Sequence, residues 1–118
     1  MKANWPKPHK EFAIPLYGGR VYVFTGKKKV ALARTYLKLP PRDKGREYGF
    51  CEHSVHSETG DSLYLIGWFN GKWDTLAHEI AHACFFSLAY AGIDVRESAG
   101  EAFCYLLSDL LCKAGIDK

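Results

Sequence analysis

Two short runs of aromatic and β-branched residues lie near the start of the chain, separated by a pair of glycines. The runs cover residues 11–17 and 20–25, on either side of Gly18 and Gly19. A two-residue glycine connection supplies the positive φ values that a tight hairpin turn requires. Pro15 interrupts the first run and marks it as an edge strand or an irregular segment. The pattern predicts a β-hairpin.

A second pair of runs covers residues 48–55 and 62–69, with a polar connection that contains Gly60 and Asp61. Glycine and aspartate are typical turn residues, so this pair is expected to form another hairpin. Residues 63–69 are almost continuously apolar, which indicates a well-covered strand.

Between the two hairpins, residues 30–39 carry apolar side chains at the spacing of a short helix, although a strand is not excluded. Pro40 and Pro41 end this segment, and a charged loop follows over residues 42–46.

The longest helical pattern begins near Leu76, where Asp74 or Thr75 is expected to cap the helix. Apolar residues surround this segment on nearly all sides, which predicts a buried central helix. Gly92 is the expected residue after its end.

A last helix is expected to start with a capping box at Asp94 and Glu97 and to run to about Lys113, where Gly115 stops it. Together, the strand-like and helical segments predict an α+β fold.

The composition predicts one domain, because 118 residues with 47% apolar content suit a single folded core. Residues 1–10 are polar and rich in proline and lysine, and they are expected to form a flexible arm without the apolar segment of a signal peptide. The most apolar run, residues 81–93, is too short to span a bilayer. The four cysteines form no C-x-x-C pair, which favours free thiols and a cytoplasmic location.

The charge is uneven. Residues 1–50 hold 12 basic and 3 acidic side chains, whereas residues 51–118 hold 4 basic and 10 acidic ones. A basic first half is compatible with nucleic-acid binding. However, these basic residues are expected mostly in loops, including Lys27 to Lys29, and they match no known binding motif. A solvated surface is therefore the preferred interpretation, and nucleic acid is not the expected partner.

The central helix carries the sequence H-E-x-x-H, formed by His78, Glu79 and His82. Side chains at positions i and i+4 lie on the same face of a helix, so both imidazoles can bind one metal ion. Glu79 projects beside them, where it can take a proton from a metal-activated water. The spacing therefore predicts a catalytic zinc site.

A catalytic zinc usually has three protein ligands. The extended H-E-x-x-H-x-x-G-x-x-H pattern is absent, because Phe85 and Leu88 occupy the positions that would need glycine and histidine. The third ligand must come from elsewhere, and Glu101 is favoured because antiparallel packing of the last two helices would bring it level with His82. Glu97 is the alternative, although it falls nearly one turn too early.

Other polar residues have simpler interpretations. Tyr105 follows Glu101 by four residues, on the same helical face, and is either a hydrogen-bond donor to a developing oxyanion or a packing residue. His53 and His56 are expected at the surface, because a spacing of three places them on opposite faces of a strand. Cys104 and Cys112 are expected to be small core residues.

The segment from Thr75 to His82, followed by Glu101-Ala-Phe-Cys-Tyr-Leu106, resembles the small zincin-type metallopeptidases of phages and prophages. More broadly, it resembles the gluzincin arrangement. The resemblance implies a small mixed sheet packed on the active-site helix, with the C-terminal helix following. It also implies that His78, His82 and Glu101 bind zinc, that Glu79 is the general base, and that substrate lies extended along an edge strand.

The expected function is therefore zinc-dependent hydrolysis of a peptide bond in a peptide or protein substrate. Residues 62–69 are expected to pair with the substrate if they form the edge strand that faces the site. Two alternatives stay open: a catalytically silent zincin-fold module that binds a protein, and a basic nucleic-acid-associated protein with a structural zinc.

Overall fold

A computed structural model describes residues 5–40, 48–56 and 59–115 of the chain. Within these ranges the polypeptide forms a small α+β domain, in agreement with the sequence pattern. The elements follow in the order β1 (Lys10–Ala13), β2 (Arg20–Phe24), α1 (Lys27–Tyr36), β3 (Gly49–Val55), β4 (Ser62–Trp68), α2 (Trp73–Tyr90), the 3₁₀ turn η1 (Glu97–Gly100) and α3 (Glu101–Ala114).

The strands form one mixed sheet in the order β1-β2-β4-β3. Both predicted hairpins are antiparallel pairs, β1 with β2 and β3 with β4, whereas β2 and β4 run parallel. Strand β1 ends at Ala13, so residues 14–19 connect the first pair, and the predicted two-residue glycine turn is wrong. Strand β4 is buried at all seven positions because it has a neighbour on each side. The expectation that β4 is the edge strand available to substrate is therefore wrong. Among the described residues, the edges are β1 and β3.

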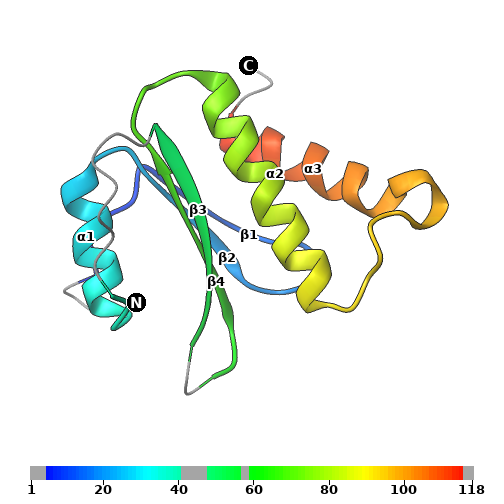
Figure 1. Ribbon diagram of the computed structural model, residues 1–118, viewed down its shortest axis with the longest axis horizontal. Helices are drawn as coiled ribbons and strands as arrows, with labels where there is room; N and C mark the ends of the chain where they lie inside the picture. The colour runs from blue at the N-terminus through cyan, green and yellow to red at the C-terminus, as the bar shows by residue number, and fades with distance from the viewer. Residues whose placement is uncertain (1–4, 41–47, 57–58, 116–118) are drawn as a thin grey trace.

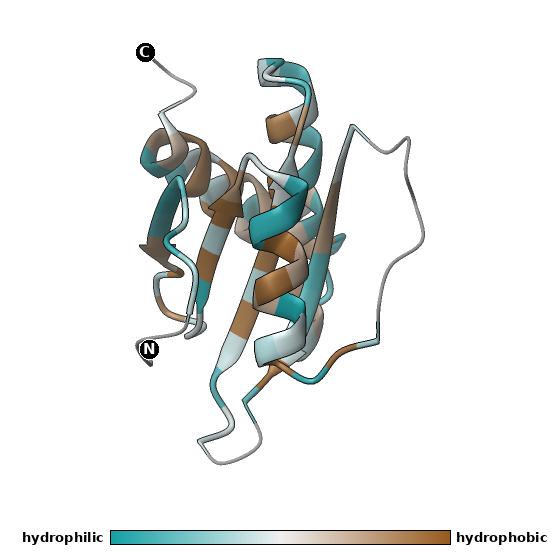
Figure 2. Ribbon diagram, turned by 90° about the vertical axis from the view of Figure 1, so that its left-hand side faces the viewer, coloured by the Kyte–Doolittle hydropathy of each residue, from teal (hydrophilic) through white to brown (hydrophobic). Residues whose placement is uncertain are grey.

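The helices cover both faces of the sheet (Figure 1). Helix α1 lies on one face, where its apolar side chains pack against alternate residues of β2, β3 and β4. Helices α2 and α3 lie on the other face, over the larger part of the core. Figure 2 looks onto α1, and hydrophobic and hydrophilic bands alternate along the strands behind it. This alternation is the expected pattern for strands whose successive side chains point to opposite faces.

Helix α1 confirms the helical interpretation of its segment, but it begins earlier, so Lys27 to Lys29 form its first turn and not a loop. Arg34 is buried on this helix although it carries a charge. Its guanidinium donates hydrogen bonds to the Glu52 carboxylate on β3 and to the carbonyl oxygen of Pro40. The ion pair thus ties α1 to one edge of the sheet.

Helix α2 begins three residues before the predicted start, with Lys72 as its N-cap residue and Asp74 in its first turn. The predicted side-chain cap is therefore wrong. Its end agrees with the prediction: Gly92 has a φ of 78°, and the amides of Gly92 and Ile93 donate hydrogen bonds to the carbonyls of Ala89 and Leu88. This pattern is a Schellman motif, in which a left-handed glycine satisfies the last carbonyls of the helix.

Helix α2 is less enclosed than its apolar sequence suggests. Its buried residues face the sheet and α3, but four aromatic residues are exposed: Trp73, Phe85, Phe86 and Tyr90. The expected burial on nearly all sides is therefore only partly correct.

Helix α3 starts at Glu101, later than the predicted capping box. Ser98 and Ala99 have φ values of 52° and 57°, and Gly100 has a φ of 78°. Left-handed residues cannot continue a right-handed helix, so they separate Glu97 from α3. Gly115 ends the helix in a left-handed conformation, as expected.

The expected arm at residues 1–10 is packed against the domain from Trp5 onward. The indole ring of Trp5 contacts the rings of Tyr22, Phe24 and Tyr36, and β1 begins at Lys10. The predicted charged loop at residues 42–46 and the first residues of the turn at 57–58 lie outside the described residues. Of the helices that the structure describes, none is long and apolar enough to cross a membrane.

Candidate metal centre

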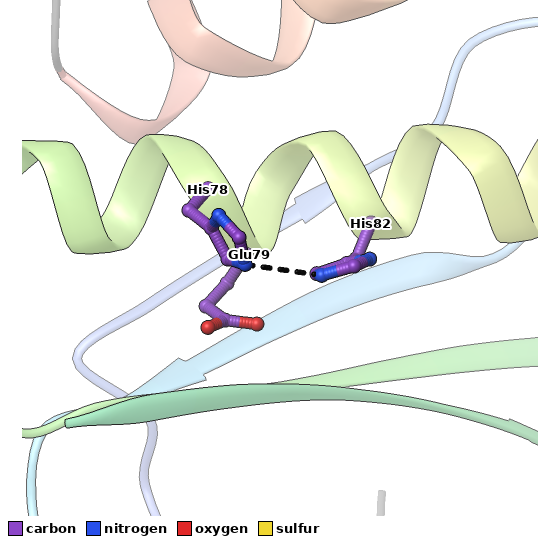
Figure 3. Close-up of side chains that lie close together, drawn as sticks. All are labelled: His78, Glu79 and His82. Atoms are coloured by element: carbon purple, nitrogen blue, oxygen red, sulfur yellow. Dashed lines mark hydrogen bonds between the residues drawn. The ribbon is translucent and has the colours of Figure 1, made fainter. Parts of the chain in front are cut away.

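His78 and His82 present their imidazole rings on one face of α2, as the spacing predicts (Figure 3). Their Nε2 atoms are 3.2 Å apart, and both residues are exposed. Two nitrogen ligands of one tetrahedral zinc ion, at the usual Zn–N distance, are separated by about 3.3 Å. The donor set and its spacing therefore fit a zinc ion at this position.

Glu79 lies beside the two histidines but is buried, with 7% of its surface exposed. Its carboxylate extends from α2 toward the strands in Figure 3. Ligand atoms of His78, Glu79 and His82 all lie within 4.8 Å of one another. The carboxylate is thus close enough to act on a small molecule held at the histidines, while the sheet limits its movement.

Gly49 at the start of β3 allows α2 to approach the sheet at this point. A Cβ atom at this position would lie 2.8 Å from the carbonyl oxygen of Gly67 and 2.9 Å from Cγ2 of Thr75. It would also lie 3.3 Å from Cγ of Glu79. A glycine is required by these contacts. The local sequence does not reveal this requirement, because the clashing atoms belong to β4 and α2, which are distant in the chain.

A polar cavity of about 360 Å³ lies between the start of β3 and the first two turns of α2. It adjoins the histidine pair and contains exposed side chains from both elements. Its lining residues are Tyr48, Gly49, Asp74, Thr75, His78 and Glu79. The cavity gives small polar groups access to the carboxylate of Glu79.

Cys51 also faces α2, two residues after Gly49. Burial raises the pKa of the Cys51 thiol, and the neighbouring carboxylate of Glu79 raises it further. These effects favour the protonated thiol in the metal-free chain. Among the described residues, Cys51 does not belong to the group of ligand atoms that lie together.

Strand β3 has a free hydrogen-bonding edge next to the histidines within the described part of the chain. The amide of Phe69 donates to the Tyr48 carbonyl and the amide of His56 donates to the Asp61 carbonyl, at the two ends of the β3–β4 pair. Hydrogen-bonded pairs alternate along an antiparallel ladder. The odd-numbered residues of β3 therefore direct their N–H and C=O groups away from β4, and these are Gly49, Cys51, His53 and Val55.

Glu101, the predicted third ligand, is exposed at the first residue of α3 and does not belong to the cluster of ligand atoms. In Figure 3 the three clustered side chains extend toward the strands, whereas α3 lies on the opposite side of α2. Helix α3 crosses over α2 at an angle in Figure 1, so the two helices are not aligned along their lengths. The structure thus brings together His78, Glu79 and His82. The assignment of Glu101 as the third ligand stays a prediction.

Tyr105 is 73% exposed on α3 and is also outside the cluster, so its suggested catalytic role has no support from this geometry. Glu97, the alternative ligand, lies in η1 and is exposed. Cys104 and Cys112 are exposed as well, so their expected place in the core is wrong; Cys84 is the buried cysteine of the four, and all four are free.

His53 is half-buried and not a surface residue as expected. Its ring stacks on Tyr64, with centroids 4.6 Å apart, and its Nε2 atom is 2.9 Å from Oγ of Ser62. Burial lowers the pKa of His53. Its ring is therefore neutral at neutral pH and behaves as part of an aromatic cluster.

Comparisons with known proteins add no relative: no protein-family model, curated protein or solved structure matches this chain.

Proposed function

We propose that this protein is a zinc-dependent metallopeptidase of the zincin type. The observation that carries the proposal is the 3.2 Å separation of the His78 and His82 Nε2 atoms, with the Glu79 carboxylate beside them. Both histidines are exposed, so a metal ion held by them has open coordination positions, as a catalytic site requires.

Each group of the chain has a distinct part in the proposed reaction. A bound zinc ion would supply Lewis acidity, which makes water more acidic and polarises a peptide carbonyl. His78 and His82 would hold the ion. Glu79 accepts a proton from the attacking water and returns it to the leaving amine. Its burial under α2 keeps the carboxylate oriented toward the histidine pair.

The free edge of β3 supports a peptide as the substrate. An extended peptide can add to a sheet edge through backbone hydrogen bonds, which are independent of its side chains. The outward N–H and C=O groups of Cys51 and His53 lie in the plane of the sheet at its free edge, and the side chains of these two residues face α2. Strand β3 thus replaces β4 as the proposed pairing strand.

One observation favours the alternative of a module that binds a protein without cutting it: Glu101 lies outside the ligand cluster. The structural-zinc alternative has less support, because structural zinc sites are usually closed by four protein ligands. In the described residues, the cluster contains three candidate groups, two of them exposed.

The test is hydrolysis of a peptide mixture by the zinc-loaded chain, with Glu79→Gln as the inactive control. Glu79→Gln should retain zinc and lose at least about a hundredfold in rate, because it removes the proposed base and leaves both histidines. Equal cleavage by the two proteins, or no cleavage by either, would overturn the peptidase proposal.

Glu101→Ala tests the third ligand in the same preparation. As a zinc ligand, Glu101 should contribute about a hundredfold to zinc affinity, whereas Glu97→Ala should have no effect. Competition with a chromogenic chelator measures both constants. If Glu101→Ala binds zinc as tightly as the unchanged protein, then its predicted role is wrong and the site has two histidine ligands.

A further inference from the structure

Three aromatic rings form a continuous surface next to the candidate metal centre, which we call the aromatic shelf: His53 on β3, and Phe86 and Tyr90 on α2. The His53 ring lies 6.1 Å from Phe86 and 5.2 Å from Tyr90 between centroids. Phe86 is 38% exposed and Tyr90 is 56% exposed. Two elements that are distant in sequence therefore place exposed aromatic surface at one location.

The shelf is rigid and neutral. The buried Tyr64, opposite His53 on the neighbouring strand β4, stacks in parallel against the His53 ring, and the Ser62 hydroxyl forms a hydrogen bond with its Nε2 atom. The lowered pKa of His53 keeps this ring uncharged at neutral pH. A rigid and uncharged aromatic surface favours contact with an apolar group over a solvated charge.

The shelf begins one helical turn from the candidate metal ligands. The ring of Phe86 lies 6.5 Å from the ring of His82, at an interplanar angle of 30°. His53 is also one of the β3 residues whose N–H and C=O groups point to the free edge. A peptide strand paired with β3 would place the side chain opposite His53 on the same face of the sheet, about 5 Å away between Cβ atoms.

We propose that the aromatic shelf is a specificity subsite, which accepts a large apolar or aromatic side chain of a peptide paired with β3. This inference rests on the proposed peptidase function and identifies its substrate class. The polar cavity lies at the opposite end of the histidine pair, beside Gly49 and Thr75. A peptide along β3 therefore meets an apolar subsite on one side of the histidines and a polar one on the other.

The experiment measures binding separately from cleavage. Zinc-loaded Glu79→Gln protein is titrated with fluorescent peptides of eight residues that differ at a single position, which carries Phe, Leu, Ala or Lys. The position is moved along the peptide in a series. At one position we expect the Phe and Leu peptides to bind about tenfold more tightly than the Ala and Lys peptides.

Substitutions in the aromatic shelf of the same protein show whether the shelf is the source of this preference. Phe86→Ala and Tyr90→Ala should each reduce the Phe-over-Ala preference to about threefold or less. Phe85→Ala is the matched control, because Phe85 is a neighbouring exposed aromatic residue on α2 whose ring contacts Phe103 of α3. It should leave the preference unchanged. Tyr90 is the more exposed shelf residue, so Tyr90→Ala keeps the test decisive if Phe86→Ala fails to fold.

The outcomes separate the inference from the proposed function. Suppose that the shelf variants remove the preference for aromatic peptides, but the unchanged protein cleaves no peptide. This result would support the subsite and overturn the proposed peptidase function. Cleavage without such preference, or with a preference that the shelf variants retain, overturns the subsite alone. Absence of peptide binding at millimolar concentration also overturns it. A dimer in sedimentation that Tyr90→Lys dissociates would show that a second copy covers the shelf, and this result too would overturn the inference.

Discussion

Strand β3 presents Glu52 to α1 on one face of the sheet, and Gly49 and His53 to α2 on the other. On the α1 face, the carboxylate of Glu52 pairs with the buried guanidinium of Arg34. On the α2 face, Glu79 is as deeply buried as Arg34, but it lies beside two exposed imidazoles and an accessible cavity.

This difference shows that one strand can contribute to the stability of the fold on one face and to the candidate metal centre on the other. A buried charge is costly unless it is paired, and the α1 face resolves this cost with an opposite charge from another element. The α2 face instead places its metal-binding groups at the surface, where removal of one group costs little folding energy. Substitutions on the two faces should therefore have different effects. Those on the α1 face should lower the free energy of unfolding, and those on the α2 face should lower the affinity for zinc and for substrate.

The largest effect is expected for His78→Ala and His82→Ala. Each should weaken zinc binding by about a hundred- to a thousandfold, because one of few metal ligands is lost. The metal-free proteins should unfold within about 0.5 kcal/mol of the unchanged chain, since both side chains are exposed.

Chelator competition gives the zinc affinities, and urea unfolding in the presence of EDTA gives the stabilities. Undiminished zinc in either variant would contradict the assignment of the ligands. A large loss of stability in the metal-free state would instead break the proposed separation of the two faces.

The next effect is expected on the α1 face. Glu52→Gln leaves the Arg34 guanidinium buried without its charge partner and should lower the free energy of unfolding by about 2–4 kcal/mol. Zinc affinity of the folded protein should stay unchanged. Glu11→Gln is the matched control, because its ion pair with Arg20 is exposed and should contribute less than about 1 kcal/mol. Similar urea midpoints for the two variants would show that burial of the pair is not important.

A third prediction concerns Gly49 of β3, where the strand leaves no room for a side chain beside α2. Gly49→Ala should destabilise the domain by about 1–3 kcal/mol, because the added Cβ atom overlaps the Gly67 carbonyl and Thr75. This substitution should also shift Glu79 and lower the hydrolysis rate. Gly26→Ala is the control, since a Cβ atom there meets nothing within 4 Å, and its effect should lie within about 0.5 kcal/mol. Equal thermal stabilities of the Gly49→Ala and Gly26→Ala proteins would mean that α2 can move away from β3 without loss of folding free energy.

Local chemistry explains which parts of the fold were predictable. Gly92 and Gly115 end their helices, and Gly18 and Gly19 lie in the connection of the first hairpin, because each has a left-handed backbone at a turn or cap. The pair formed by His78 and His82 was equally predictable, since helical geometry alone sets the separation of residues four apart.

The remaining features depend on contacts between distant segments. The continuous apolar run of β4 indicated a well-covered strand, but its parallel pairing with β2, which makes it central in the sheet, is not encoded locally. The start of α3 was mispredicted because Ser98 and Ala99 adopt left-handed conformations that their side chains do not favour. The position of Glu101 depends on this start and on how α3 crosses α2.

The smallest effect is expected from the pH dependence of stability on the α2 face. Burial lowers the pKa of His53 below the ordinary value of 6.5, so its ring is neutral in the folded state. As the pH falls through 6.5, the unfolded chain takes up a proton that the folded chain does not. This difference favours unfolding, so the contribution of His53 to stability is complete above pH 6.5 and is lost under acidic conditions.

His53→Phe tests this prediction, because it removes the titrating group and retains an aromatic ring over Tyr64. Urea unfolding of both proteins between pH 7.5 and pH 5 should show a smaller loss of stability for His53→Phe. The difference should arise below about pH 6.5 and be absent above it. Parallel curves would indicate that protonation of His53 is not coupled to folding, and the neutral character of the aromatic shelf would lose its basis. A steeper loss in His53→Phe would reverse the sign of the argument and place the charged imidazole in the folded state.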